Sequence, residues 1–246
     1  MVKQYDDTNI KAIADAIRAK NGTTNKYKTS EMADAIREIS DRNAMLDGSI
    51  TTVSSDVTKI NDYALAKCIN LTSADFPLAT SMGTYAFYNC SNLETINLPL
   101  LQSFGSMALG YCTALKGAVF PEVTSLGDSA LIGCKTAEMF DFHQYMTIGN
   151  YAFRYCHTLK ALVLRSGTLC TIPAETVFQN CYHLYGTTDS TYNPNGLKDG
   201  YIYVPSALVA SYKANSLWST FSTRFRALES YTVDGTTTGA LDESKI

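Results

Sequence analysis

Seven cysteines and three histidines are the side chains of this 246-residue chain that could bind a metal ion or act as a nucleophile. Two of the histidines, His157 and His183, follow a cysteine by one and two residues, as in a thiolate–imidazole pair. Five cysteines recur every 22 residues and a sixth follows after 25, at Cys68, Cys90, Cys112, Cys134, Cys156 and Cys181. Only Cys170 is out of phase. Equal spacing of this kind indicates a structural repeat.

The usual uses of cysteine and histidine do not fit this spacing. Zinc ligands come in close pairs such as C-x-x-C, and the chain has none. In stacked repeats, equivalent Cβ atoms stay about 4.8 Å apart on parallel bonds, whereas a disulfide needs converging Cβ atoms about 3.8 Å apart. The three histidines lie in three different repeats, and no G-x-S-x-G or H-E-x-x-H motif is present. We therefore predict buried cysteine fillers at tight turns, with no metal site, no cofactor and no enzymatic activity.

The elements that position these cysteines form a repeat of small, large and alternating apolar residues. Counted from each of the five cysteines spaced by 22 residues, position −4 is alanine and position −3 is leucine or phenylalanine. Position −7 is Asn61 in the first copy and glycine at Gly83, Gly105, Gly127 and Gly149. Glycine there predicts a turn with positive φ. An L-x-x-I-x-L ladder follows the cysteine and predicts a short strand with one buried face. The fold class that follows is α/β, a leucine-rich-repeat solenoid with short parallel strands and short helical turns.

The unit IGNYAFRYCHTLKALVL, residues 148–164, resembles the BspA-like leucine-rich repeats of bacterial surface and phage proteins. The same pattern recurs five times, and the resemblance covers roughly residues 57–185. The copy that contains Cys134 departs from it, because Ala137 replaces the leucine and His143 stands where proline is usual.

Both ends of the chain depart from the repeat. After a polar interruption at 186–200, YIYVP supplies a strand with Ile202 and Val204 facing inward, and a helix with Ser206 as its N-cap follows. This segment resembles the C-terminal cap of such repeats. The first residues carry two helical patterns that resemble a helical module of phage tail-fibre and baseplate proteins. We expect three domains: an attachment module (1–45), about six repeats (46–187), and the insertion, cap and polar tail (188–246).

Charge and hydropathy limit the class of partner. The formal charge of −3 lacks the basic footprint of a nucleic-acid binder. The chain has no run of 18 apolar residues, so we expect no transmembrane helix. The stretch MVKQYDDTNIKAIADAIRAK lacks the apolar core of a signal peptide. Tyrosines should edge the helical side of the repeats, where they serve packing or bind a carbohydrate; they are Tyr63, Tyr85 and Tyr151 at position −5, and Tyr88, Tyr111 and Tyr155 near the cysteines.

The outward strand positions are the expected binding surface, because solenoids offer rigid surfaces that usually bind a partner. They change from polar to apolar along the axis, and the candidate residues are Asp75, Asn97, Val119, Met139, Asp141, Val163, Tyr201 and Tyr203. We expect a virion component of a phage or prophage tail tip, a fibre or baseplate protein made in the host cytoplasm. It would bind a host cell-surface protein or glycan, join other tail proteins through the N-terminal helices, and could be a homo-oligomer. The alternatives are a bacterial cell-surface adhesin lacking its leader and an intracellular protein-binding scaffold.

Overall fold

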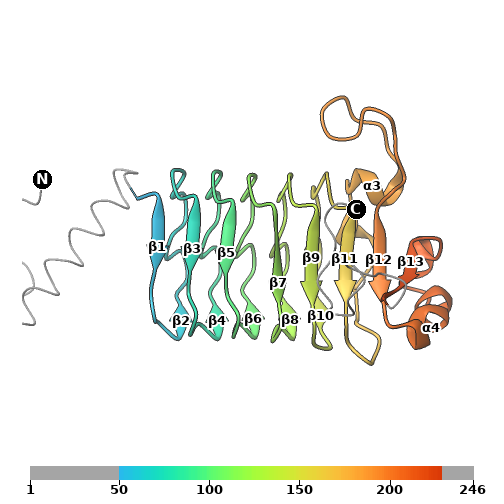
Figure 1. Ribbon diagram of the computed structural model, residues 1–246, viewed down its shortest axis with the longest axis horizontal. Helices are drawn as coiled ribbons and strands as arrows, with labels where there is room; N and C mark the ends of the chain where they lie inside the picture. Colours follow the sequence, from blue (N-terminus) through green and yellow to red (C-terminus); the bar gives the residue numbers. More distant parts are fainter. Residues whose placement is uncertain (1–49, 229–246) are drawn as a thin grey trace, which may run out of the picture. The chain divides into compact units, whose positions relative to one another are not determined.

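The computed structural model describes residues 50–228, which form a row of rungs lying side by side (Figure 1). One edge of the row carries the longer strands β1 (Thr52–Ser54), β3 (Ser73–Asp75), β5 (Thr95–Asn97), β7 (Gly117–Phe120), β9 (Met139–Phe142), β11 (Ala161–Leu164), β12 (Tyr201–Val204) and β13 (Phe225–Ala227). Two-residue strands follow the turns, at β2 (Lys59–Ile60), β4 (Ser81–Met82), β6 (Ser103–Phe104), β8 (Ser125–Leu126) and β10 (Thr147–Ile148). All pairings between these strands are parallel. The leucine-rich-repeat solenoid predicted from the sequence is confirmed.

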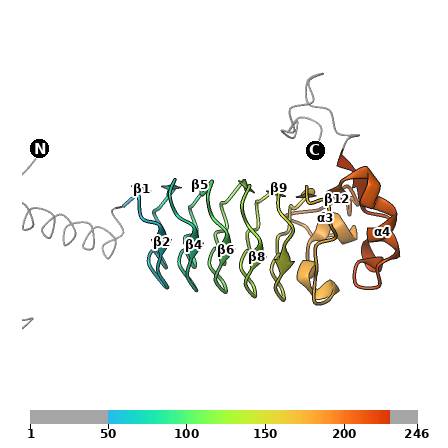
Figure 2. The same cartoon turned by 90° about the horizontal axis from the view of Figure 1, so that it is seen from below.

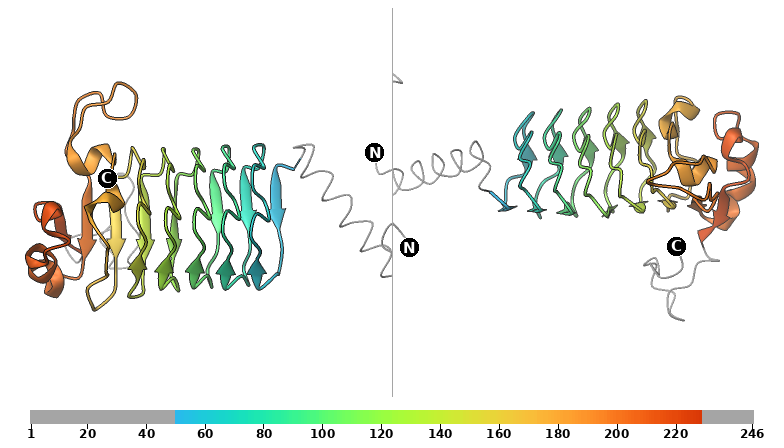
Figure 3. Two further views of the ribbon diagram at one scale, coloured as in Figure 1. Left: turned by 180° about the vertical axis from the view of Figure 1, so that it is seen from behind. Right: turned by 90° about the horizontal axis from the view of Figure 1, so that it is seen from above.

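The 22-residue period sets the register of the sheets. Ser73 pairs with Thr95 across β3 and β5, and Met139 pairs with Ala161 across β9 and β11. The inward ladder members are buried, with Leu93, Leu115 and Leu159 each fully enclosed. Because each rung buries its apolar side chains only against its neighbours, the stack forms one continuous core. Figure 3 shows the same row from behind and from above.

The in-phase cysteines occupy the centre of the turns and are buried, as predicted. Each thiol from Cys90 onward also donates a hydrogen bond to the backbone carbonyl of the position −3 residue in the preceding rung. The Sγ–O distances are 3.0 Å for Cys90 to Leu65, 3.3 Å for Cys112 to Phe87, 3.5 Å for Cys134 to Leu109, 3.3 Å for Cys156 to Leu131 and 3.0 Å for Cys181 to Phe153. Cysteine therefore serves here both as a small filler and as a weak donor that joins one rung to the next.

The repeated glycines do not have the role that the sequence pattern predicted. None of Gly83, Gly105, Gly127 and Gly149 has a positive φ. A Cβ atom on Gly105 would lie 2.5 Å from the backbone of Gly83, and one on Gly127 would lie 2.7 Å from that of Gly105. Glycine is required because successive backbones touch. Positive φ occurs instead at two other positions of the repeat. At position −5 the residues are Tyr63, Tyr85, Met107, Ser129 and Tyr151. At position −1 they are Lys67, Asn89, Tyr111, Gly133, Tyr155 and Asn180.

The C-terminal cap covers the last rung with a second set of aromatic side chains. Its short helices are η1 (Glu175–Phe178), α3 (Tyr182–Tyr185), η2 (Ser206–Leu208), α4 (Val209–Ala214) and η3 (Ser219–Phe221), with α4 at the end of the row (Figure 2). Tyr212 and Trp218 are buried in it. The Cys170 N–H donates to the Tyr212 hydroxyl at 2.7 Å, and Trp218 Nε1 donates to the Cys170 carbonyl at 3.0 Å. These two bonds connect the out-of-phase cysteine to the cap.

Strand β12 pairs with β11 as predicted, and Ile202 and Val204 are fully buried. The helix expected after it is shorter, and Ser206 is not its N-cap: η2 begins at Ser206 after Pro205, and no side chain caps it. Strand β13, which pairs with β12, was not predicted. The expected attachment module (1–45) lies outside the described residues, and the predicted domain boundaries stay a prediction.

Candidate binding site on the outer sheet face

The outer face of the sheet is polar at its N-terminal end, as the alternation predicts. Asp75 is half-buried and Asn97 is exposed. Asn97 Nδ2 donates to Asp75 Oδ1 at 2.8 Å, and Ser54 Oγ donates to Asp75 Oδ2 at 3.4 Å. These side chains form a hydrogen-bonded row across adjacent rungs. Such cross-strand pairs stabilise a sheet while leaving its polar atoms in contact with water.

The expectation that the whole row of candidates is exposed is wrong at the C-terminal end. Val163 is fully buried and Tyr203 is 9% exposed. With Ala161 they form a small apolar cluster on the outer face, against which Met139, Tyr201 and Leu228 pack. Strand β11 is therefore buried on both faces, which is why ALVL carries no polar side chain.

Asp141 is buried as well, at 3% exposure, and its carboxylate already has a partner. Arg165 binds it with two nitrogens, Nε at 2.9 Å from Oδ1 and Nη2 at 2.8 Å from Oδ2. This bidentate geometry is the strong form of an arginine–carboxylate pair. His143 Nε2 lies 3.5 Å from Asp141 Oδ1. Of the candidates, Asn97 and Val119 are exposed, and Asp75, Met139 and Tyr201 are half-buried. The guanidinium of Arg226 lies 4.1 Å from the centroid of the Tyr201 ring.

Val119 and Met139 line a hollow of about 640 Å³, which we call the sheet-face groove. It lies where the sheet is interrupted, because one sheet ends at β5 and the next begins at β7. Gly117 begins β7 with a φ of 148°, and a Cβ atom there would lie 2.4 Å from the Met139 carbonyl oxygen. Ile96 is only half-buried at this break and lines the groove with Ala118. The groove therefore has an apolar floor.

Charged side chains of alternating sign lie on successive rungs, and the first three of them line the groove. They are Glu94, Lys116, Glu138 and Lys160, each of which lies four residues after a cysteine. Lys116 Nζ lies 2.7 Å from Glu94 Oε2, and Lys160 Nζ lies 3.4 Å from Glu138 Oε1. Exposed ion pairs of this kind contribute little to stability, about 0–1 kcal/mol each. We call these four residues the charge ladder.

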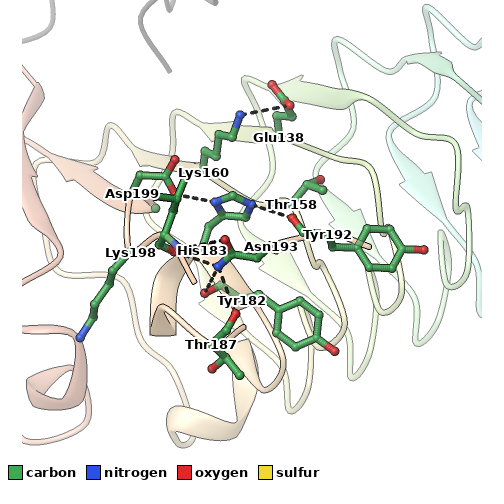
Figure 4. Close-up of polar contacts among 12 residues, drawn as sticks. Glu138, Thr158, Lys160, Tyr182, His183, Thr187, Tyr192, Asn193, Lys198 and Asp199 are labelled. Atoms are coloured by element: carbon green, nitrogen blue, oxygen red, sulfur yellow. Dashed lines mark hydrogen bonds and ion pairs between the residues drawn. The ribbon is translucent and has the colours of Figure 1, made fainter. Parts of the chain in front are cut away.

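The two cysteine–histidine neighbours do not form a nucleophilic pair. The Cys156 thiol donates to the Leu131 carbonyl, while the His157 ring stacks on Tyr182 with ring centroids 4.6 Å apart. His183 Nδ1 faces the Asp199 carboxylate, and Nε2 lies 3.1 Å from the Tyr192 carbonyl oxygen (Figure 4). The sequence analysis did not predict the stacking of His157 on Tyr182, although these two residues occupy equivalent positions of the repeat, one residue after a cysteine.

Within residues 50–228, no group of three His, Cys, Asp or Glu side chains could hold a metal ion. In the same span, no helix is long and apolar enough to cross a membrane.

The repeat pattern also matches a known family model. Residues 48–160 match the family model of the BspA type leucine rich repeat region, in six copies. No curated protein sequence matches the chain. A leucine-rich-repeat protein of T. pallidum is 22% identical over 53% of this chain and 69% of its own, with a TM-score of 0.42. A leucine-rich-repeat protein of Bacteroides ovatus is 19% identical over 70% of this chain and 66% of its own, with a TM-score of 0.37. The described part of the chain is a leucine-rich-repeat solenoid, and residues 48–160 are similar to repeats of the BspA type.

Proposed function

We propose that the solenoid is a binding module and that the sheet-face groove receives a segment of a protein on the host surface. The observation that carries this proposal is the groove itself, an open hollow with an apolar floor between exposed charged rims. An apolar centre inside a polar rim is the usual anatomy of a protein–protein contact. Val119 is 46% exposed beside it and offers an apolar contact that no other described element covers.

The rungs around the groove are suited to this role because they are fixed to one another. Glu138 N–H donates to the Lys116 carbonyl at 3.0 Å, and the thiol bonds join the same rungs on the inner side. A rigid surface loses little conformational entropy on binding, so more of the contact energy appears as affinity.

We further propose that this module belongs to a phage or prophage tail tip. The support is the resemblance of residues 1–45 to a tail-fibre and baseplate module, together with repeats of a type that phage and bacterial surface proteins share. A bacterial surface adhesin and an intracellular scaffold would use the same groove. Mass spectrometry of purified particles from an induced culture separates the three. Detection of the chain only in the cell envelope would favour the adhesin, and detection only in the cytosol would favour the scaffold.

The groove is tested by a charge placed at its apolar edge. Val119→Lys should reduce binding of the purified protein to host cells at least tenfold, whereas Leu100→Lys should not. Leu100 is a fair control because it is also a large exposed apolar residue, 43% exposed against 46%, and does not line the groove. Equal cell binding by the two variants would contradict the assignment of the groove.

A further inference from the structure

A second hollow, of about 270 Å³, lies among the turns of the C-terminal rungs and shares no lining residue with the sheet-face groove. It is lined by Tyr111, Lys135, Tyr155, His157 and Tyr182. We call it the tyrosine pocket. Three of its five residues are aromatic phenols, one is a cation, and one is an imidazole.

The repeat builds this pocket from two columns of equivalent positions. The residue before each cysteine gives Tyr111, Gly133 and Tyr155 on three successive rungs, and the residue after it gives Lys135, His157 and Tyr182. Gly133 is the gap in the first column: a Cβ atom there would lie 2.7 Å from Cδ1 of Tyr111. Glycine at this position makes room for the Tyr111 ring, which lies where a side chain of residue 133 would begin.

The Tyr155 ring is held in place by its neighbour Arg154. The guanidinium lies 4.6 Å from the ring centroid, and Nη2 donates to the Tyr155 hydroxyl at 2.9 Å. This combination of a cation over the ring and a bond to its hydroxyl orients the phenol without covering it on both sides.

His157 is the unexplained group of the pocket. It is 7% exposed, and neither ring nitrogen has a hydrogen-bond partner among the described residues. Burial, and then the Lys135 cation, lower the pKa of His157, so the neutral ring offers one donor and one acceptor. Buried polar atoms are nearly always paired, and a pair of unpaired nitrogens on one ring calls for an explanation.

The rings that cover His157 come from the 186–200 loop and from α3. The Tyr192 ring centroid lies 4.4 Å from that of His157, and the Tyr182 ring stacks on the same imidazole at 4.6 Å. The loop backbone is fixed independently of these rings. Asn193, which is 1% exposed, donates through Nδ2 to the Thr187 carbonyl at 3.1 Å and to the Leu197 carbonyl at 2.9 Å.

Figure 4 shows the Tyr182 and Tyr192 rings projecting to the same side, away from the His183–Asp199 contact. Because the main chain of the loop is held at Asn193 and at the Tyr192 carbonyl, the Tyr192 side chain is the part that can turn. Its rotation would admit a ligand hydroxyl to the nitrogens of His157.

The lining points to one ligand chemistry. Tyrosine rings present an apolar face with a polar edge, which suits the C–H face and the hydroxyls of a sugar. Lys135 makes no ion pair within residues 50–228, and no carboxylate lines the pocket. The charge of Asp189 acts on His157 from outside the lining, and its Oδ1 accepts the N–H groups of Thr191 and Tyr192. A ligand of matching charge is therefore an anion. The volume is just below the range of about 300–1,000 Å³ typical of drug-sized ligands, which corresponds to one sugar unit of a longer glycan.

We propose that the tyrosine pocket binds one acidic sugar of a surface glycan. The ring packs on Tyr155 and Tyr182, a hydroxyl bonds to His157, and a carboxylate or phosphate lies beside Lys135. This site is separate from the sheet-face groove, and either can exist without the other.

The test uses the full chain on an array of defined oligosaccharides that pairs carboxylated and phosphorylated glycans with their neutral counterparts. Binding constants for the strongest acidic glycan and its neutral counterpart are then measured by titration calorimetry. Lys135→Gln should lower the affinity for the acidic glycan at least tenfold and leave the affinity for the neutral glycan unchanged. Tyr182→Leu should lower both affinities. Tyr63→Ala is the matched control, because Tyr63 is an exposed tyrosine at a distant rung, and it should change neither.

His157→Leu provides a readout that a packing role cannot reproduce. Replacing a buried imidazole with unpaired nitrogens by an apolar side chain should raise the melting temperature, whereas the affinity for the acidic glycan should fall at least tenfold. The proposal is overturned if no acidic glycan on the array binds, or if His157→Leu and Lys135→Gln bind it like the wild type. Val119→Lys should retain glycan binding, so failure at the groove and failure at the pocket are distinguishable.

Discussion

The Cys156 thiol donates to the Leu131 carbonyl at 3.3 Å, and that carbonyl lies 25 residues earlier in the chain, in the neighbouring rung. The same contact recurs at Cys90, Cys112, Cys134 and Cys181. The cysteine column thus connects successive turns on the inner side of the solenoid. We expect these thiols to be unreactive because each sulfur is buried and donates a hydrogen bond.

The first prediction concerns thiol reactivity. All seven cysteines are buried with free thiols, and burial raises their pKa values, so few thiolates exist at pH 8 in the folded protein. Ellman's reagent at pH 8 should label no thiol on the timescale of minutes in the native chain and all seven in guanidinium. Rapid labelling of any in-phase cysteine in the native state would contradict its placement in the core.

The second prediction concerns alkaline stability. Burial raises the pKa of Cys90 from 9.0 to about 12. For a group whose folded pKa is raised, the stabilising contribution is complete below the unfolded pKa and is lost as the pH rises toward the folded value. The free energy of unfolding should therefore fall between pH 9 and 12, by up to about 1.4 kcal/mol per pH unit for each such thiol. Urea unfolding at pH 8 and pH 10.5 measures this loss, and Cys90→Ala should make it smaller.

The third prediction concerns the glycine column. Gly105→Ala would place a Cβ atom 2.5 Å from the backbone of Gly83, so adjacent rungs must separate. We expect a loss of about 1–3 kcal/mol or more in the free energy of unfolding, as for other overpacked cores. Gly167→Ala is the control, because a Cβ atom there would meet nothing within 4 Å. Chemical unfolding of both variants gives the comparison, and an equal small effect would show that the rungs are less tightly stacked.

The fourth prediction separates the two ends of the outer sheet face. Val119 and Val163 occupy equivalent positions two rungs apart, but the first is 46% exposed and the second is fully buried. Val163→Asp should destabilise the fold by more than about 3 kcal/mol, because it buries an unpaired charge. Val119→Asp should change stability by less than about 0.5 kcal/mol. Thermal and urea unfolding report both, and a stable Val163→Asp protein would place the apolar cluster at the surface.

The sequence was sufficient for the repeat, the inward ladder and the strand at 201–204, because each is a recurring pattern of side-chain size. It was insufficient for Asp141, Val163 and Tyr203. Alternation within a strand says which face a side chain occupies, but not whether a distant residue such as Leu228 packs over that face. The role of glycine was misjudged for a related reason. A glycine can satisfy a positive φ or a close backbone contact, and only the position of the neighbouring rung distinguishes the two.

No sequence pattern predicted the break in the sheet between β5 and β7. Gly117 has a φ of 148°, and a Cβ atom there would lie 2.4 Å from the Met139 carbonyl oxygen of the next rung, a contact that the sequence alone does not show. The residues of the tyrosine pocket could be identified more readily from the sequence. Its columns could be listed from the repeat, but the close approach of the Tyr111 ring to Gly133 depends on how the rungs stack.

The charge ladder also constrains how a chain of this kind can grow or shrink. Glu94, Lys116, Glu138 and Lys160 alternate in sign from rung to rung. Deleting the 22-residue unit that carries Lys116 or the one that carries Glu138 would place two like charges side by side, which is unfavourable on neighbouring rungs. Deleting both units, or duplicating both, preserves the alternation. With respect to these charges, the length of the solenoid therefore changes in steps of two rungs.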